Sequence, residues 1–376
     1  MTATDPAPAP IPHQVLARAG EGPMPRYRIV SLVHLGDGHV LAAFDGRDTG
    51  EDVPDPTGLH QRRSLDGGRS WGPIEDIRPA DREHRIWSTD PSYVHDPDSG
   101  RLFLFHTRAK DRGVWDAVVG TDDESRDVLS SALATSEDEG RSWDFTSLTA
   151  IASEPPIRAA FATSGVGVRL TRGPHAGRLL QPYAGWFPTD AESAGRTTAD
   201  RAEEVRSFCL FSDDHGATWQ RGESVGTDMD ETTIAELSDG RVLLNSRHHH
   251  RRQGLRHLAV SADGGQSWQD LGTTDVFADP GNNAQLARRF PDAPADDPRS
   301  RELLFSNTAH ATERRRGTLH RSRDDGETWQ ELLVFEPGPC EYSAVQALED
   351  GAAGVLWEVG SEEIRFARLE ADQLEG

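Results

Sequence analysis

Cysteine is scarce in this chain, which has only Cys209 and Cys340 among its 376 residues. Their flanking residues show no spacing typical of metal ligands, and two thiols cannot build a disulfide framework. Hydrophobic residues are also few, at 35%, whereas 36 glycines and 23 prolines are available for turns. Because many short strands need many turns, this balance favours an all-β architecture whose stability does not depend on disulfides.

Positive charge and long apolar runs are scarce as well. Forty lysines and arginines stand against 63 acidic residues, which gives a formal net charge of -23. A polyanion of this kind is a poor partner for nucleic acid or for an anionic membrane surface. No stretch of 18 apolar residues occurs, so we expect no membrane insertion. An anionic substrate would need a local cationic pocket to overcome the overall charge.

The N-terminus lacks the basic start and the apolar run of a signal peptide. We therefore expect a cytoplasmic protein, or a secreted one if a leader has been removed. Alanine and proline dominate the first residues, and we predict that residues 1–22 form an extended N-terminal tail. Residues 23–376 are then predicted to form one domain.

The sequence does contain five copies of the motif Ser-x-Asp-x-Gly-x-(Ser or Thr)-Trp. The copies are residues 64–71, 136–143, 212–219, 261–268 and 322–329. In such a motif the aspartate accepts backbone hydrogen bonds, the glycine takes a positive φ, and the tryptophan packs on apolar surface. A calcium loop would need more closely spaced oxygen ligands than each copy supplies. The motif therefore predicts a hairpin turn.

The spacing of these turns predicts the fold. A strand-like run precedes each copy, and the copies begin 49 to 76 residues apart. A four-stranded propeller blade takes roughly 40–50 residues, and insertions lengthen it. We predict a six-bladed β-propeller with four-stranded antiparallel blades. Closure of the ring should bring residues near 25–35 against residues near 350–370.

Propellers bind ligands at one end of the central channel, where the inner strands converge. Polar residues in or after apolar strands are therefore candidates for a binding site. The candidates are Arg28, Asp52, Glu231, Arg247, Arg314 and Tyr342.

The five turns, together with Tyr27-Arg28-Ile29 at the start of the first strand, resemble the bacterial sialidases (exo-α-neuraminidases) of the Asp-box, or BNR-repeat, propeller class. The resemblance covers roughly residues 24–370. The segments 44–47, 61–64, 88–92, 237–247 and 303–307 also resemble that family. One departure is Val30, where the family usually has a proline that would fix the backbone beside the first arginine.

The resemblance implies a binding site for the carboxylate of sialic acid. Arg28, Arg247 and Arg314 would hold this carboxylate, since guanidinium groups bind carboxylates with bidentate, charge-assisted hydrogen bonds. They would also supply the positive field that the chain as a whole lacks. Glu358 would fix the orientation of Arg28, and Asp90 would help to shape the pocket for the N-acyl or glycerol side of the sugar.

The resemblance also implies the catalytic residues. Tyr342 would be the nucleophile, Glu231 its base, and Asp52 the general acid/base. Sialidases use tyrosine where most retaining glycosidases use a carboxylate. A neutral phenol avoids repulsion by the carboxylate of the substrate, but it needs an activating base because free tyrosine titrates near 10. Asp52 must be protonated to act as an acid, so we expect an acidic rate optimum.

These residues predict a glycoside hydrolase, an exo-α-sialidase. It would release terminal sialic acids from oligosaccharides, glycoproteins or glycolipids with retention, through a tyrosyl-linked intermediate and without metal or cofactor. The same machinery could instead act on another nonulosonic acid, or transfer the sugar as a trans-sialidase. A non-catalytic sialoglycan-binding propeller is a third interpretation. It would be expected to lack Tyr342, Glu231 or Asp52, and all three are present.

Two further features concern the rim of the pocket. Neighbouring residues on a strand point in different directions, so we expect the run 248–250 of three histidines to form part of the rim and not a metal site. Trp87, Trp115 and Trp186 lie outside the repeats and are expected in the core. Trp186 is also a candidate to stack on a sugar.

Overall fold

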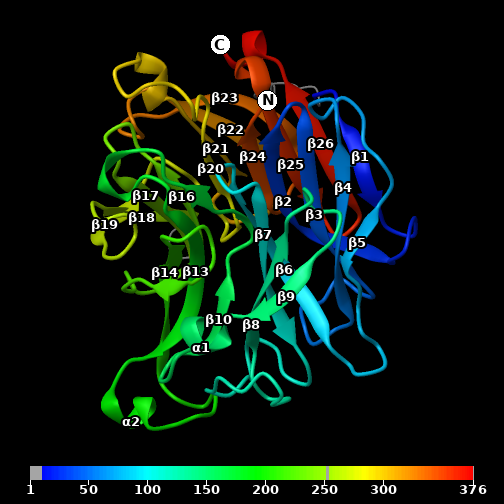
Figure 1. The fold of residues 1–376 in the computed structure, drawn as a ribbon, viewed down its shortest axis with the longest axis vertical. Helices are drawn as coiled ribbons and strands as arrows, with labels where there is room; N and C mark the ends of the chain where they lie inside the picture. The colour runs from blue at the N-terminus through cyan, green and yellow to red at the C-terminus, as the bar shows by residue number, and fades with distance from the viewer. Residues whose placement is uncertain (1–10, 251–253, 376) are drawn as a thin grey trace, which may run out of the picture.

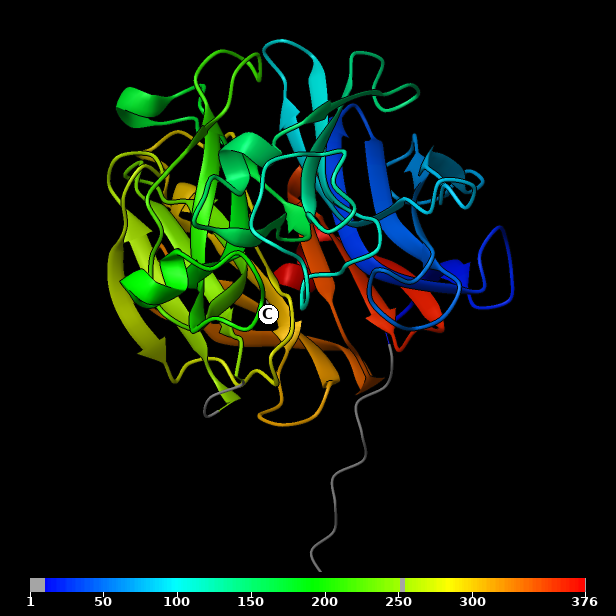
Figure 2. The same ribbon diagram turned by 90° about the horizontal axis from the view of Figure 1, so that it is seen from below.

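The computed structural model describes residues 11–250 and 254–375. Six antiparallel sheets follow one another in a ring (Figure 1), which confirms the predicted six-bladed propeller. Viewed from below, the blue and red ends of the chain lie side by side in this ring (Figure 2). No helix among these residues is long and apolar enough to cross a membrane.

The first three blades run from the innermost strand outward. The first blade is β2 (Arg26–Gly36), β3 (His39–Arg47), β4 (Thr57–Ser64) and β5 (Glu75–Arg78). The second is β6 (Trp87–Asp96), β7 (Arg101–Ala109), β8 (Ser130–Ser136) and β9 (Asp144–Ser147), with β11 (Gly165–Val166) added beside β6. The third is β10 (Arg158–Ala162), β13 (Leu179–Pro188), β14 (Glu203–Ser212) and β15 (Gln220–Arg221), with β12 (Val168–Arg169) added beside β13. Two short helices, α1 (Thr149–Ala152) and α2 (Ala191–Ala194), lie in its connections.

The last three blades follow the same plan. The fourth is β16 (Met229–Glu236), β17 (Val242–His248), β18 (Arg256–Ser261) and β19 (Gln269–Thr274). The fifth is β20 (Gln285–Arg288), β21 (Leu303–Thr308), β22 (Arg315–Ser322) and β23 (Gln330–Pro339). The sixth is β24 (Ser343–Ala347), β25 (Ala353–Val359), β26 (Glu363–Leu369) and β1 (Gln14–Arg18).

The position of β1 corrects the predicted tail. Gln14–Arg18 fall within the predicted tail of residues 1–22 but form the outer strand of the last blade, antiparallel to β26. An uncovered β26 would be an exposed sheet edge, and β1 covers it. The expected contact between the two ends of the chain is present, because Leu32 and Leu356 share one apolar cluster. Residues 1–10 of the predicted tail lie outside the described residues.

The repeated motifs form the expected turns, between the third and fourth strands of the first five blades. In the first copy, Asp66 accepts hydrogen bonds from the Ser70 amide at 2.8 Å and hydroxyl at 2.5 Å. Gly68 has φ +83°. The Trp71 ring packs edge-on against Phe366 of the sixth blade, with 4.9 Å between centroids. The tryptophan therefore joins two blades. The sixth blade has no such turn because its fourth strand comes from the other end of the chain.

A short segment, residues 163–167, connects the inner strands near the channel axis. β11 pairs with β6, and the Thr163 hydroxyl donates to the carbonyl of Thr232 at 2.7 Å. Asn283, just before β20, donates to the Ser164 carbonyl at 2.7 Å. These bonds link the second, fourth and fifth blades through one segment.

Candidate active site

One pocket opens at the end of the channel where the inner strands begin. It encloses about 590 Å³ of empty space, its open mouth included. Five blades contribute to its wall, and the predicted site residues Asp52, Asp90, Glu231, Arg247 and Tyr342 are all among the lining residues. These side chains are far apart in sequence and are brought together by closure of the ring.

β-Bulges at this end of the inner strands aim side chains into the pocket. The register with the second strand shifts between Arg28 and Val30, and similar shifts occur at the same place in β6, β10 and β16. On a regular strand neighbouring side chains face opposite sides, and a bulge re-aims them. Asp230 and Glu231, which lie inside one bulge, can therefore both line the pocket.

The three predicted arginines converge on Tyr342, which is buried immediately before β24. Arg247 Nη1 donates to the Tyr342 hydroxyl at 3.3 Å. The guanidinium carbons of Arg28 and Arg314 lie 5.4 and 5.7 Å from the centre of the same ring. The geometry thus places three cations around one phenol.

Two glutamates fix Arg28. Glu358 accepts from Arg28 Nε at 3.1 Å and from the Ile29 amide at 2.6 Å, and it holds Ile29 at the unusual φ of +56°. Burial raises the pKa of Glu358 to about 8, although Arg28 opposes this shift. Glu341 lies 3.1 Å from Arg28 Nη2. Glu358 thus contacts Arg28 from the buried side, and its role in orienting Arg28 stays a prediction. Glu341 was not among the predicted residues.

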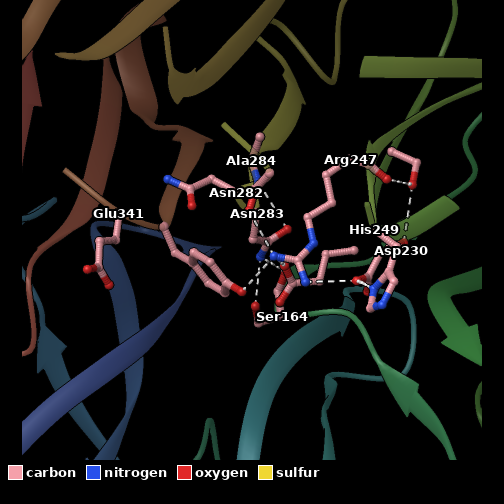
Figure 3. A network of polar contacts seen from close by, with 12 residues as sticks. Ser164, Asp230, Arg247, His249, Asn282, Asn283, Ala284 and Glu341 are labelled. Atoms are coloured by element: carbon pink, nitrogen blue, oxygen red, sulfur yellow. Dashed lines mark hydrogen bonds and ion pairs between the residues drawn. The ribbon is translucent and has the colours of Figure 1, made fainter. Parts of the chain in front are cut away.

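Arg247 lies in a second carboxylate network (Figure 3). Its Nη2 donates to Asp230 at 2.8 Å, and its Nη1 lies 2.9 Å from Glu231. His249 Nδ1 lies 2.7 Å from the same oxygen of Asp230. Asp230 and Glu341 directly precede Glu231 and Tyr342 in sequence. That adjacency was the only signal for them, and the alternation of a regular strand would have turned them away from the pocket.

The pKa values of the neighbouring carboxylates Asp230 and Glu231 are shifted in opposite directions. Burial acts to raise the pKa of Asp230, but Arg247 and His249 outweigh it, so this pKa lies below its usual value. Burial and the charge of Asp230 raise the pKa of Glu231 against the effect of Arg247. Burial also raises the pKa of Tyr342 well above its usual value, against Arg247. The resting phenol is therefore neutral, next to a carboxylate of increased basicity.

Arg314 differs from the other two arginines. Its Nη2 donates to the Gly281 carbonyl at 3.2 Å. Among the described residues, no carboxylate oxygen lies within 4 Å of its guanidinium group, whereas Arg28 and Arg247 are each paired with at least two carboxylates. Arg314 is thus the least compensated cation beside Tyr342.

Asp52 lies in the loop between β3 and β4, with 60% of its side chain exposed. Arg47 Nη1 donates to its Oδ1 at 2.9 Å, and Arg28 Nη1 lies 3.9 Å from the same atom. Burial acts to raise the pKa of Asp52, but Arg47 and Arg28 outweigh it and bring the pKa below its usual value. Arg47 is itself buried and bonded to Asp45 at 2.9 Å. Neither Arg47 nor Asp45 was predicted as a site residue.

Asp90 lies in the pocket wall with φ +61°. Burial, together with the nearby charges of Asp45 and Glu231, raises its pKa well above the usual value. The raised pKa favours the protonated carboxyl group, which can donate a hydrogen bond.

Apolar side chains cover the wall beside Asp90. Trp186 is buried yet lines the pocket, and Trp115 lines the mouth with 60% of its surface exposed. The His249 ring lies 5.6 Å from each of these indole rings. Trp87 is buried in the core, as expected, whereas the exposure of Trp115 contradicts the prediction that it belongs to the core. A loop insertion in the second blade carries Trp115 out to the mouth.

Across residues 11–250 and 254–375, the one group of three possible metal ligands is Asp96, Asp98 and His215. None of the three lines this pocket. Arg169 lies 3.6 Å from Asp96 and also pairs with Asp98, so a cation of the protein already contacts both carboxylates of this cluster.

The fold and the pocket define a propeller with a cationic and acidic site at one end of its channel. Residues 38–355 match the model of the BNR repeat-like domain, and the chain belongs to that family. It is 44% identical over 365 residues to a sialidase of Micromonospora viridifaciens, an alignment that covers 96% of this chain and 54% of that protein. The chain thus spans about half the length of this relative. These findings confirm the resemblance drawn from the sequence.

A second relative and a solved structure are also named sialidases. Sialidase-2 of Rattus norvegicus is 28% identical over 369 residues, which cover 90% of this chain and 91% of that protein. The solved structure of the Hadza microbial sialidase Hz136 has the same fold, with a TM-score of 0.82 at 22% identity. That superposition covers 96% of this chain and 69% of the other.

Proposed function

We propose that this chain is an exo-α-sialidase that hydrolyses terminal sialic acids of oligosaccharides, glycoproteins or glycolipids. The observation that carries the proposal is the convergence of Arg28, Arg247 and Arg314 on Tyr342 in a protein of net charge -23. A sialic acid bears its carboxylate on the anomeric carbon, so a site for that carboxylate places the reacting carbon beside the phenol. Relatives named sialidases support the same assignment.

In the first step, the Tyr342 oxygen attacks the anomeric carbon while Glu231 accepts the phenolic proton. Asp52 gives its proton to the oxygen of the departing sugar, and the bond to that oxygen breaks. The product is a sialyl group linked to Tyr342. The raised pKa of Glu231 suits it to this role, because a base is most effective when its pKa approaches the working pH.

In the second step, Asp52 removes a proton from water and the hydroxide attacks the same carbon. Glu231 returns its proton to the Tyr342 oxygen as the bond to the sugar breaks. Two displacements give net retention of configuration. Binding also prepares the acid, since the carboxylate of the substrate offsets the positive field of Arg28 that lowers the pKa of Asp52.

The wall formed by Asp90, Trp186 and Phe161 suits the N-acyl side of the sugar. The raised pKa of Asp90 favours its protonated form, which can donate a hydrogen bond, and the two rings offer apolar contact. Such a wall supports an N-acylated sialic acid over a sugar with a bare hydroxyl group at that position.

The test is hydrolysis of a fluorogenic α-sialoside from about pH 4 to pH 7, with Tyr342→Phe and Asp52→Ala measured alongside. We expect turnover by the unmodified protein and a loss of at least about 100-fold in Tyr342→Phe. Asp52→Ala should show the same loss with 3′-sialyllactose, whose leaving group needs the proton, and α-sialic acid should be the first product seen by NMR. Binding without turnover would indicate a lectin and refute the proposal. Unchanged activity of Tyr342→Phe would exclude this residue as the nucleophile.

A further inference from the structure

The loop that carries Asp52 rests on a glycine of the neighbouring blade. A β-carbon at position 113 would lie 2.1 Å from the Val53 carbonyl oxygen and 3.0 Å from its carbonyl carbon. Those atoms belong to the backbone and cannot rotate away as the end of a side chain can. Only glycine therefore permits this approach, and Val53 directly follows Asp52.

Apolar packing draws the loop toward this contact. The Val53 side chain is 8% exposed and belongs to an apolar cluster with Trp87, Leu129 and Phe161 of the second and third blades. Burying a valine side chain contributes about 1.5–3 kcal/mol. The Val53 side chain thus packs on the neighbouring blades, while the Val53 carbonyl group lies against the bare backbone of Gly113.

The segment that contains Gly113 is itself anchored. The Lys110 ammonium group donates to the carbonyls of Asp123 and Ser125 at 2.9 and 2.8 Å. Arg158 Nη1 donates to the Val114 carbonyl at 2.7 Å. Within the turn, the Ala117 amide donates to the Gly113 carbonyl at 3.0 Å. A displaced contact at Gly113 would therefore move the Asp52 loop and not the anchored segment.

The carboxyl group of Asp52 depends on this backbone for its position. Its side chain is largely exposed, and its closest ion pair is with Arg47 at 2.9 Å. General acid catalysis needs the proton donor within hydrogen-bond distance of the leaving oxygen. A shift of about 1 Å at such a group can lower the rate about 100-fold.

We infer that Gly113 is a positioning residue for the reaction, which fixes the Asp52 loop so that the acid reaches the leaving sugar oxygen. This inference rests on the proposed function. It predicts a defect that depends on the leaving group. A lactose leaving group needs the proton of Asp52, whereas an acidic phenol leaves without it.

The experiment compares kcat/KM of Gly113→Ala for 3′-sialyllactose and for 4-nitrophenyl α-sialoside. This ratio reports the first displacement, in which Asp52 acts only as an acid. We expect a loss of about 100-fold with 3′-sialyllactose and of less than about threefold with the aryl sialoside. The matched control is Gly72→Ala, since a β-carbon at position 72 meets no atom closer than 3.5 Å. Gly72→Ala should leave kcat/KM unchanged for both substrates.

A second variant, Val53→Ala, removes the apolar anchor without a backbone clash, and it decides the matter if Gly113→Ala does not fold. It should show the same selective loss with 3′-sialyllactose, of at least about tenfold. Equal losses with both substrates would overturn the inference, because a merely structural defect affects them alike. Inactivity of the unmodified protein toward both sialosides would overturn the proposed function, and the inference with it.

Discussion

Arg314 offers a direct test of how the pocket attracts a carboxylate. Arg28 and Arg247 are each balanced by carboxylates of the protein, whereas Arg314 has none within 4 Å among the described residues. In Arg314→Ala the substrate carboxylate loses its least compensated partner. A charge-assisted hydrogen bond contributes about 1.5–3 kcal/mol. With 1.4 kcal/mol for each factor of ten, kcat/KM should fall about 10- to 150-fold.

The stability of this variant should change little. Arg314 gives one hydrogen bond, to the Gly281 carbonyl at 3.2 Å, so its removal leaves no buried carboxylate unpaired. Removal of Arg247 would take away the guanidinium group that pairs with both Asp230 and Glu231, at a cost of about 3–5 kcal/mol. Arg314→Ala should therefore keep the thermal midpoint of the wild type, and Arg247→Ala should lower it by several degrees.

The assay is kcat/KM for a fluorogenic α-sialoside at constant ionic strength, with thermal unfolding followed by circular dichroism. Arg315→Ala is the matched control, since this neighbouring arginine is exposed and lies 3.6 Å from Glu313. It should retain full activity. If Arg314→Ala keeps kcat/KM within about threefold, the guanidinium group does not reach the carboxylate and the charge argument is wrong.

Two further predictions follow from the pKa shifts. The proton on Asp52 must be present for a poor leaving group, and Arg47 and Arg28 outweigh burial and hold the pKa of Asp52 below 3.8 in the free enzyme. For 3′-sialyllactose, kcat/KM should therefore already fall as pH rises above 3.8. In Asp52→Asn, kcat/KM should no longer fall with rising pH, and it should be about 100-fold lower than in the unmodified protein. If the fall with pH persists in this variant, another group causes it. In the first turn motif, hydrogen bonds from Ser70, followed by those of Ser64 and the backbone, lower the pKa of Asp66 from 3.8 to about 2. This stabilisation is present above 3.8 and is lost as pH falls through about 2. Asp66→Asn should thus lower stability at neutral pH by at most about 1 kcal/mol, because solvent screens the exposed carboxylate, and calorimetry should show the difference vanishing near pH 2.

Much of the fold followed from local chemistry. Each turn motif is closed by its own side chains, as in the bonds from Asp66 to Ser70, so its structure does not depend on distant parts of the chain. The spacing of these turns indicated the number of blades. The prediction was wrong where a distant strand decided the outcome, since only the uncovered edge of β26 explains why Gln14–Arg18 join the sheet.

The candidate site was likewise partly predictable from the sequence and partly decided by tertiary structure. The sequence by itself determined the residue types, since Arg28, Asp52, Glu231, Arg247, Arg314 and Tyr342 could be named from their motifs. Tertiary structure decided their surroundings. Asp230 and Glu341 reach the arginines only because bulges and loop ends override the alternation of a strand.

The pKa values and loop contacts also belong to tertiary structure. The charge of Arg47 on Asp52, and the contact of Gly113 with Val53, join residues whose positions are set by ring closure and by packing between blades. Local hydrogen bonds can be read from a short stretch of sequence, whereas electrostatic fields and backbone contacts depend on distances that only the closed ring fixes.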